Sequence, residues 1–590
     1  MTAFLFGFWA LGICQEPSLL DLEPLTITKS QVHLQHPCTV KSKTIETLEG
    51  SSFIEYLRLT PLDLQSRSLK SGVQTDFSLR GSNFQGVLML LNGQRINDPQ
   101  TAHHNADIPL TKEDIEKIEV LPGVSSSIFG PDAIGGAVNF ILKKPKGRKI
   151  VLETSGGQHQ AVNELFSYQD KIGPLGLRAS WENQKSDGFS QDTDFEKRTS
   201  SVGSTLEIPD GEWDLDFGYQ EKEFGAFDFY TPGLGYPSKE WTRTYLLNTG
   251  LNLDKGGLTI KPNFLWRRHY DKFMLDKTNV RSRYLNYHRT DVFTPNIYFQ
   301  KQTGWLGSVG LGLEYGQEQI RSTNLGKHNR PHKSIFMDES KDLNDKFSWG
   351  MSLRFDDFAG FPEVYTGSTS FKYKVSPQDS FNLGVSRSMR VPSFTELYYN
   401  DPTTLGNADI SAEKSLNYQA GFEHGQEKLS WGLTFFLRRE KDFIDWVKHS
   451  FSQARWQVEN ITEDEVFGSE SYIRFKFNDY LSLDSFYTYI NKYAEGQGLT
   501  YKYGPNYIRH LSNTALSFHL PFGEQSVEFV YKQKPHRPGW FLLNARLSLQ
   551  FHKNAQIFLD AANLTDKKYQ EIEGIPQPGR WLEAGLRLEW

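Results

Sequence analysis

From about residue 147 to the C-terminus, the chain alternates apolar and polar residues with a period of two. In 542–551 the two faces separate cleanly, with Leu543, Ala545, Leu547, Leu549 and Phe551 opposite Asn544, Arg546, Ser548 and Gln550. A barrel wall needs this alternation when one face meets lipid and the other a polar lumen. At about 20 residues for each strand with its connection, the remaining ~440 residues predict about 22 antiparallel strands.

The last segment keeps this pattern up to its final residue. Leu582, Ala584, Leu586, Leu588 and Trp590 alternate with Glu583, Gly585, Arg587 and Glu589. A free strand this apolar on one face promotes aggregation unless another strand closes against it. The pattern therefore predicts a closed all-β transmembrane barrel over 147–590 rather than a soluble β-sandwich.

The segment before the barrel has a mixed pattern. Residues 87–91 form a continuous apolar run, typical of a strand covered on both faces, and Asn92-Gly93 is a tight-turn signal. Residues 114–120 alternate, and 44–58 are compatible with a short helix. Because a barrel of about 22 strands leaves room in its lumen, we predict that 46–146 form an α+β plug domain inside it.

Composition supports a membrane barrel. Aromatic residues make up 14% of the chain, yet its mean hydropathy is −0.53. Outward apolar side chains and inward polar ones give this combination. After residue 13 the sequence contains no apolar run of about 18 residues, which argues against membrane helices.

The first 45 residues predict export and a flexible lead. Residues 1–16 resemble a signal peptide without its usual positive start, and 17–45 are proline-containing and weakly periodic. Within the lead, 23–29 are β-prone: they either add a strand to a partner's sheet or act as a linker. Cys14 and Cys38 are the only cysteines, which excludes a disulfide framework, and the net charge of −6 gives no reason to propose nucleic acid as a partner.

Several motifs together resemble the TonB-dependent outer-membrane receptors of Gram-negative bacteria. They are Arg80-Gly81, Asn92-Gly93-x-Arg95-x-Asn97-Asp98, Ile118-Glu119-Val120-Leu121-x-Gly123, Gly130-x-x-Ala133-x-Gly135-Gly136-x-Val138-Asn139, Ser388-Met389-Arg390-Val391-Pro392-Ser393-Phe394-x-Glu396-Leu397 and Ala562-Asn563-Leu564-Thr565-Asp566-x-x-Tyr569. Each motif is weak alone, but their order along nearly the whole chain is that of the family.

The resemblance implies an outer-membrane receptor that imports a scarce, large nutrient with energy from the TonB-ExbB-ExbD complex. Leu25, Thr26, Ile27 and Thr28 lie where the family has its TonB box, although the usual Val near its end is missing. The 225–237 segment with Tyr230, Arg267-Arg268-His269 and Asn286-Tyr287-His288 resemble cobalamin receptors. The alternatives are a ferric siderophore or haem receptor, or a passive porin or adhesin that retains a plug.

Residues of the plug and one outer loop are candidates for substrate binding. If the plug sits as in the family, the turn and the segment after it face outward: Gln94, Arg95, Asn97, Asp98, His103 and His104, with Tyr230 from a loop. Polar groups there would hydrogen-bond the amides of a ligand. The His103-His104 pair alone falls short of a metal site, because no acid or thiol clusters with it in the sequence.

Calcium is the one metal with a sequence candidate, and no other cofactor is expected. Asp187, Asp192 and Asp194 offer oxygen ligands at close spacing, but the favoured interpretation is a solvated acidic hairpin. Long polar stretches at 225–240, 316–345, 395–413 and 493–509 predict extracellular loops. No GxSxG, HExxH or phosphate-loop motif occurs, so the sequence does not predict an enzyme.

Overall fold

The computed structural model describes residues 20–21, 38–48, 50, 52–67, 72–123, 126–231, 233–279, 284–450, 452–495, 498–504 and 506–590. The predicted signal segment at 1–16 and the predicted TonB box at 25–28 lie outside these residues. Among the described residues, no helix is both long and apolar enough to cross a membrane.

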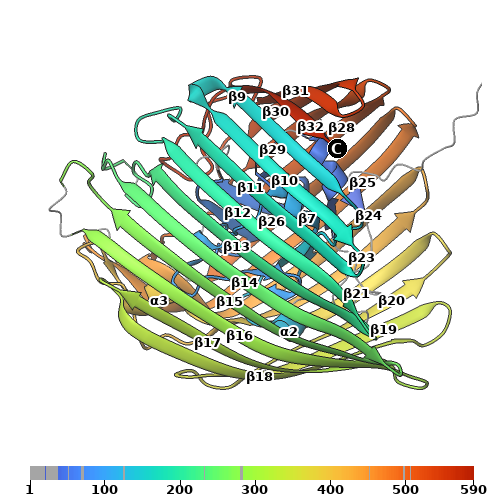
Figure 1. The fold of residues 1–590 in the computed structure, drawn as a ribbon. Coiled ribbons are helices and arrows are strands. Elements are labelled where there is room, and N and C mark those ends of the chain that lie inside the picture. Colours follow the sequence, from blue (N-terminus) through green and yellow to red (C-terminus); the bar gives the residue numbers. More distant parts are fainter. Residues whose placement is uncertain are drawn as a thin grey trace, which may run out of the picture.

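Twenty-two antiparallel strands close a barrel, as predicted (Figure 1). They are β9 Lys149–Gly157, β10 Val162–Ile172, β11 Leu175–Ser186, β12 Phe195–Ile208, β13 Gly211–Gly225, β14 Lys239–Lys255, β15 Leu258–Met274, β16 Leu285–Thr303, β17 Gly307–Ser322, β18 Gly326–Asp342, β19 Phe347–Phe358, β20 Val364–Lys374, β21 Asp379–Arg390, β23 Glu413–Gly425, β24 Leu429–Lys448, β25 Trp456–Asn478, β26 Leu481–Glu495, β28 His510–Leu520, β29 Gly523–Gln533, β30 Trp540–His552, β31 Ala555–Ala562 and β32 Trp581–Glu589. The final strand pairs with β9, from Glu583 opposite Gly157 to Glu589 opposite Val151. The predicted closure is therefore confirmed.

The alternation predicted for 542–551 is confirmed in β30. Leu547 and Leu549 are exposed at 52% and 43% on the outer face, whereas Arg546 and Ser548 are buried toward the lumen. Apolar side chains cover the outside of the wall, and polar ones line its inside, as a bilayer requires.

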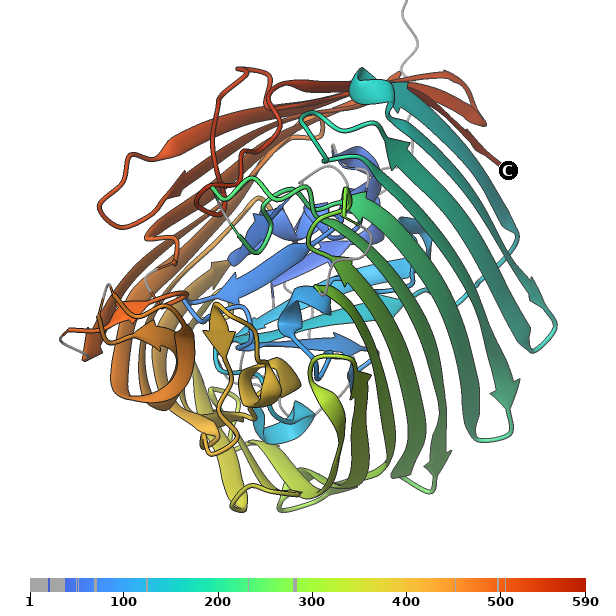
Figure 2. The ribbon, with the colours of Figure 1, turned by 90° about the vertical axis from the view of Figure 1, so that its left-hand side faces the viewer.

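The two ends of the barrel differ in the length of their connections. One end has turns such as 173–174, 209–210 and 256–257, and the other has loops such as 226–238, 391–412 and 563–580. Short turns face the periplasm and long loops face the exterior in barrels of this kind. The C-terminal strand ends among the short turns, and the loop end faces the viewer in Figure 2.

The prediction of a loop at 316–345 is wrong. Strands β17 and β18 run through most of it and pair in register from Ser308 opposite Ser340 to Ser322 opposite Gly326. Residues 326–333 are polar on both faces because these strands extend beyond the lipid into water, where the outer face has no reason to be apolar. Apart from the ends of barrel strands, the described residues of the other long stretches contain only short elements: α3 Phe394–Tyr398, β22 Thr404–Leu405 and β27 Thr500–Tyr501.

The plug lies within the ring of barrel strands (Figure 2). Its main sheet has the order β1 Leu20–Asp21, β2 Cys38–Lys41, β7 Ile115–Pro122, β8 Gly136–Leu142, β5 Val87–Leu91 and β6 Gln94–Arg95, and β3 Leu62–Ser66 pairs with β4 Thr75–Leu79. The short helices are α1 Ser42–Thr47, η1 Glu55–Leu59, η3 Ala102–His104, η4 Lys112–Asp114 and α2 Ser126–Phe129. Two separate helical turns, α1 and η1, therefore replace the single helix predicted over 44–58.

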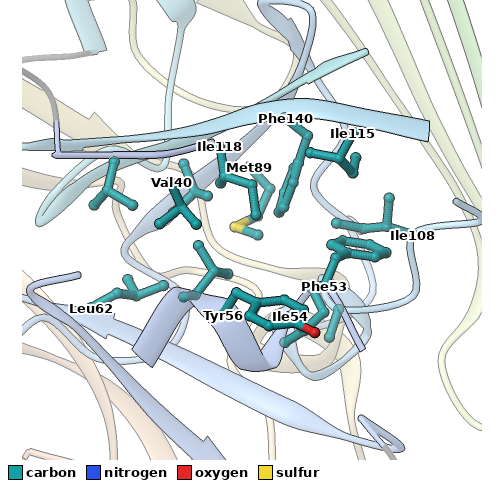
Figure 3. Packing of buried hydrophobic residues seen from close by; sticks show 14 of the residues in the cluster. Val40, Phe53, Ile54, Tyr56, Leu62, Met89, Ile108, Ile115, Ile118 and Phe140 are labelled. Atoms are coloured by element: carbon teal, nitrogen blue, oxygen red, sulfur yellow. The ribbon is translucent and has the colours of Figure 1, made fainter. Parts of the chain in front are cut away.

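The largest apolar cluster of the plug lies between the sheet and these helices (Figure 3), and a second one around Leu88, Leu90 and Ala137 is separate from it. Val40, Met89, Ile118 and Phe140 from the sheet face Tyr56 from η1. All residues of β5 are buried, which confirms that 87–91 are covered on both faces. Asn92 and Gly93 after it have φ of 46° and 83°, as a tight hairpin turn needs.

Glycines 135 and 136 allow the chain to approach its neighbours closely. A Cβ on Gly135 would lie 2.2 Å from the Leu79 carbonyl oxygen, and one on Gly136 2.2 Å from that of Leu121. Gly136 also has a φ of 142°, which other residues rarely adopt. Any larger residue would push β8 away from the strands that hold it.

Charged pairs join the plug to the inner wall. Arg58 on η1 lies 2.7 Å from Glu528, Arg178 lies 2.6 Å from Asp114, and Lys532 lies 2.9 Å from Asp63. Three further pairs are Lys112–Glu153, Arg587–Glu113 and Arg80–Glu470. All of these side chains are nearly inaccessible, so the interface combines burial with charge.

We predict that Glu470→Ala loosens the plug. Arg80 donates to both carboxylate oxygens of Glu470, at 3.0 and 2.7 Å, and removing the carboxylate leaves a buried guanidinium unpaired. Breaking such a pair costs about 3 kcal/mol, so hydrogen exchange of the β4 and β5 amides should accelerate about a hundredfold. Glu465→Ala, which breaks an exposed pair with Arg439, is the matched control and should change exchange little. Equal effects of the two substitutions would contradict this account.

The single described cysteine gives a second prediction about the plug. Cys38 packs against the plug core, and burial raises the pKa of its thiol to about 12. Since the thiolate is the reactive form, Cys38 in a Cys14→Ser background should react with maleimide at pH 8 at least about a thousandfold more slowly than a free thiol. The same protein in urea is the control. A folded protein that reacts at the unfolded rate would show that the thiol is not buried.

Candidate functional site

The plug segment 98–107 lies against the wall near the long-loop end. Asp98 pairs with Arg267 and accepts a hydrogen bond from Thr290 Oγ1 at 3.1 Å. The Arg267 guanidinium also donates to the His104 carbonyl at 3.1 Å. These contacts fix η3 beside the outer halves of β15 and β16, immediately below the long loops.

A continuous row of aromatic rings crosses the plug apex from one loop to another; we call it the aromatic row. Phe84 of the plug lies edge-on to Tyr503, with ring centroids 5.0 Å apart, and stacks on His103 at 4.2 Å and 10°. His103 lies 5.9 Å from Tyr230, which in turn contacts Phe273 of β15 at 5.1 Å. Phe84, Tyr230 and Tyr503 are each only partly buried, so the row retains surface for a ligand.

Tyr230 is held in place by the folding of its loop. The Asp228 carboxylate accepts hydrogen bonds from the backbone N–H groups of Gly233, Gly235 and Tyr236, at 2.9 to 3.1 Å. The Tyr230 hydroxyl donates to Glu240 at 3.1 Å and accepts from Gln74 of the plug at 3.0 Å. The loop is thus bound to both the wall and the plug.

A second aromatic group lies on the loop between β21 and β23. Ser393 and Glu396 form a capping box at the start of α3, and Arg390 pairs with Glu396 at 2.9 Å. Tyr398 in this helix stacks on His328 with ring centroids 3.6 Å apart. Tyr398 and the neighbouring Tyr399 are partly buried against the apolar cluster that also contacts Tyr503. Aromatic faces of this kind suit a large ligand with apolar and planar parts.

Four of the predicted substrate-binding residues lie at the loop end but are buried. Asn97 holds the plug backbone, accepting from Met89 N at 2.7 Å and donating to the Val87 carbonyl at 3.0 Å. His103 Nδ1 lies 2.7 Å from Asp76, and burial lowers the pKa of its ring. Asp98 and His104 face the wall. Direct ligand contact by these four stays a prediction.

The orientation predicted for the start of the turn is wrong. Asn92, Gly93 and Gln94 line a depression together with Glu212 and Lys261, which stand beside the short turns. The β5–β6 hairpin points this way because β5 runs parallel to β8, and its end at Leu91 faces the periplasmic side. Arg95 forms ion pairs with Asp132 and Glu318, each at 2.6 Å.

Tyr230 and His103, two of the predicted binding residues, meet in the aromatic row, whereas the sequence did not single out Phe84 and Tyr503. In a chain with 42 Phe and 26 Tyr, an aromatic residue by itself indicates a lipid-facing strand as readily as a ligand site. One signal was available, since Phe84 follows the Arg80-Gly81 motif in a polar stretch without strand alternation. Tyr503 approaches it from a loop more than 400 positions later, which no local pattern reveals.

The three calcium candidates do not converge. Asp192 pairs with Lys277, Asp194 lies 3.9 Å from Lys239, and Asp187 is exposed. Within the described ranges, both groups of close His and acidic ligand atoms lie elsewhere, around His104. Calcium binding at these aspartates stays a prediction.

Two family models match the chain. One, described as TonB dependent receptor-like, beta-barrel, covers residues 153–564, and the other, the TonB-dependent Receptor Plug Domain, covers 34–137. Together they span the barrel and the plug seen in the structure.

Similar proteins include two curated transporters and several solved receptors. The vitamin B12 transporters BtuB of Photobacterium profundum and Vibrio vulnificus are 24% and 23% identical, each over 73% of this chain and 71% of their own length. The siderophore receptor PiuA from Acinetobacter baumannii superposes with a TM-score of 0.79 at 14% identity, covering 98% of this chain and all of its own. A mutant of the ferric enterobactin receptor PfeA from Pseudomonas aeruginosa gives 0.77 at 14% identity, with 94% and 98% coverage.

Proposed function

The chain belongs to the TonB-dependent receptor family, and on that premise we propose that it imports a corrinoid of the cobalamin class across the outer membrane of a Gram-negative bacterium. The observation that carries the ligand class is the similarity to two vitamin B12 transporters along 73% of the chain. The family consists of receptors and transporters rather than enzymes, and its members work with TonB and bind small ligands.

The aromatic row supports a large ligand at the plug apex. A corrinoid presents a broad, largely apolar macrocycle with amide groups at its edge. Phe84, Tyr230 and Tyr503 offer ring surface to the macrocycle, and backbone groups of the long loops would take the amides. Because the row joins two loops to the plug, a ligand that settles on it contacts both moving and fixed parts.

Coupling to TonB follows from this contact. A ligand bound to the loops and the plug apex shifts the plug toward the state in which the segment at 25–28 is available to TonB as an added strand. Coupling of this kind is reciprocal, so ligand occupancy raises the affinity for TonB and TonB raises the affinity for ligand. Pulling on the segment then has to break the charged pairs that hold the plug in the wall.

A ferric siderophore is the second candidate ligand. Its support is the fold likeness to solved siderophore receptors at 14–16% identity, which is a likeness of architecture. Calorimetry of the purified receptor with cobalamin, ferric enterobactin and haem separates the candidates. Tight binding of cobalamin alone supports the proposal, and tight binding of either iron compound without cobalamin overturns it.

For ligand binding, we predict that Phe84→Ala raises the Kd for cobalamin about tenfold, which corresponds to about 1.4 kcal/mol. The substitution removes the ring that joins Tyr503 to His103 at the plug apex. Tyr480→Ala is the control, because Tyr480 is 59% exposed on a short turn at the opposite end. Unchanged affinity in the Phe84 variant would show that the aromatic row is not part of the binding site.

For transport, we predict that deleting residues 23–29 abolishes cobalamin uptake and leaves binding intact. The deletion removes the β-prone segment, so TonB has nothing to pull on although the loops and plug apex are unchanged. Deleting 30–36, seven residues from the same lead, is the matched control and should preserve uptake. Labelled cobalamin uptake by cells without another receptor is the measurement. Uptake that survives loss of 23–29 would favour a passive porin or an adhesin.

A further inference from the structure

Imidazoles and carboxylates from the plug and the wall meet in a buried group beneath the loop of 226–238. We call it the seam cluster, and its members are His104 and Asp107 of the plug, Glu240 of β14, His269 and Asp271 of β15, and His288 of β16. Each of these six residues is at most 7% exposed. None of them is used by the aromatic row except Glu240, which accepts the Tyr230 hydroxyl.

The charges of this region do not balance in pairs. Asp98 is paired with Arg267, and Asp107 with Lys222. Glu240 and Asp271 remain, and among the described residues no lysine or arginine pairs with either of them. Two buried carboxylates this close together need compensation, either by bound positive charge or by a proton on one of them.

Distances within the cluster suit shared coordination better than hydrogen bonding. His104 Nε2 lies 3.5 Å from Asp271 Oδ2, and His288 Nε2 lies 4.0 Å from the same oxygen. Ligand atoms of His104, Glu240 and Asp271 all lie within 4.8 Å of one another. Two ligands about 2.1 Å from one tetrahedral ion are about 3.4 Å apart, so small side-chain adjustments would bring His104, Glu240 and Asp271 onto one ion. His288 lies outside this group of three and would complete the set by a larger movement of its ring toward Asp271.

Unused polar atoms point to the same conclusion. Asp271 Oδ1 and His288 Nδ1 have no hydrogen-bond partner, although both residues are more than nine-tenths buried. Asp271 Oδ2 accepts from Gln100 Nε2 at 3.0 Å, an outer contact that would orient the carboxylate. A buried carboxylate oxygen without a donor is costly unless a cation binds there.

We propose that His104, Glu240, Asp271 and His288 form a binding site for one first-row divalent metal ion, of which Zn²⁺ is the representative, at the seam between plug and barrel. Two imidazole nitrogens and two carboxylate oxygens are a Zn²⁺-type set, whereas Ca²⁺ and Mg²⁺ prefer oxygen alone. A divalent ion compensates the charges of both carboxylates. It also ties η3 of the plug to three wall strands.

A proton is the competing occupant. His104 Nε2 faces Asp271 Oδ2 at 3.5 Å, so a protonated imidazole would compensate the charge of that carboxylate. A proton on the Glu240 carboxyl would compensate the other. Metal binding and protonation of the cluster therefore exclude each other, and the measurement below decides between them.

The test is metal binding by the full-length receptor, purified without a polyhistidine tag, stripped with chelator and measured without nutrient ligand. After addition of Zn²⁺ and dialysis against a buffer with a weak chelator, elemental analysis should find one Zn²⁺ per chain. His104→Gln and Asp271→Asn should each weaken the Kd at least tenfold. His424→Gln is the matched control, since His424 pairs with Asp379 beside the short turns at the opposite end of the barrel, and it should retain the ion.

Cobalt gives a readout that needs no variant. Co²⁺ bound to the stripped wild-type protein should show the intense visible absorption of a four-coordinate nitrogen and oxygen site, and Zn²⁺ should abolish it while Ca²⁺ does not. No retained Zn²⁺ in the wild type, or equal retention in the His104, Asp271 and His424 variants, would overturn the proposal. Failure here leaves cobalamin import unaffected, and failure of cobalamin binding leaves the metal site unaffected.

Discussion

The structure depends on one constraint, which is that the inside of the barrel wall is polar. Strands that turn apolar residues to lipid must turn their alternate residues inward, and a plug that fills the lumen has to match them. It does so with buried pairs such as Arg58–Glu528, Arg178–Asp114 and Lys532–Asp63. An apolar plug surface would leave the charges of the wall buried without partners. Each such charge would cost several kcal/mol of folding free energy.

This kind of interface suits a part that has to move. Removing one partner of a buried ion pair strongly destabilises the folded protein. The intact pair, however, contributes little more to stability than a well-packed apolar contact would. The largest apolar cluster of the plug, around Tyr56, Met89 and Phe140, is by contrast mostly internal, and only Leu246, Leu265 and Ala515 join it from the wall. Most of the apolar contacts that keep the plug folded are therefore within the plug. On the proposed import mechanism, pulling from the periplasm has to break the charged pairs first.

The sequence predicts the wall far better than it predicts the site. Period-two alternation in 542–551 and 582–590 follows directly from lipid on one side of the wall. The presence of strands, the side chains that face lipid and the closure of the barrel could therefore all be inferred. The same rule fails at 326–333, where strands leave the bilayer and their outer face becomes polar. It also says nothing about which way the β5–β6 hairpin points, because direction inside the lumen depends on parallel pairing with β8.

The candidate site is assembled from residues that are distant in sequence. One short plug segment, η3, contacts both of its parts. His103 and His104 are adjacent, but the first stacks on Phe84 in the aromatic row and the second faces Asp271 in the seam cluster. The Tyr230 hydroxyl joins the two groups a second time through Glu240. A rotation of η3 that adjusts the row to a ligand must therefore change distances in the seam cluster. If the proposed ligand binds at the aromatic row, η3 therefore links its binding to the contacts between the plug and the wall.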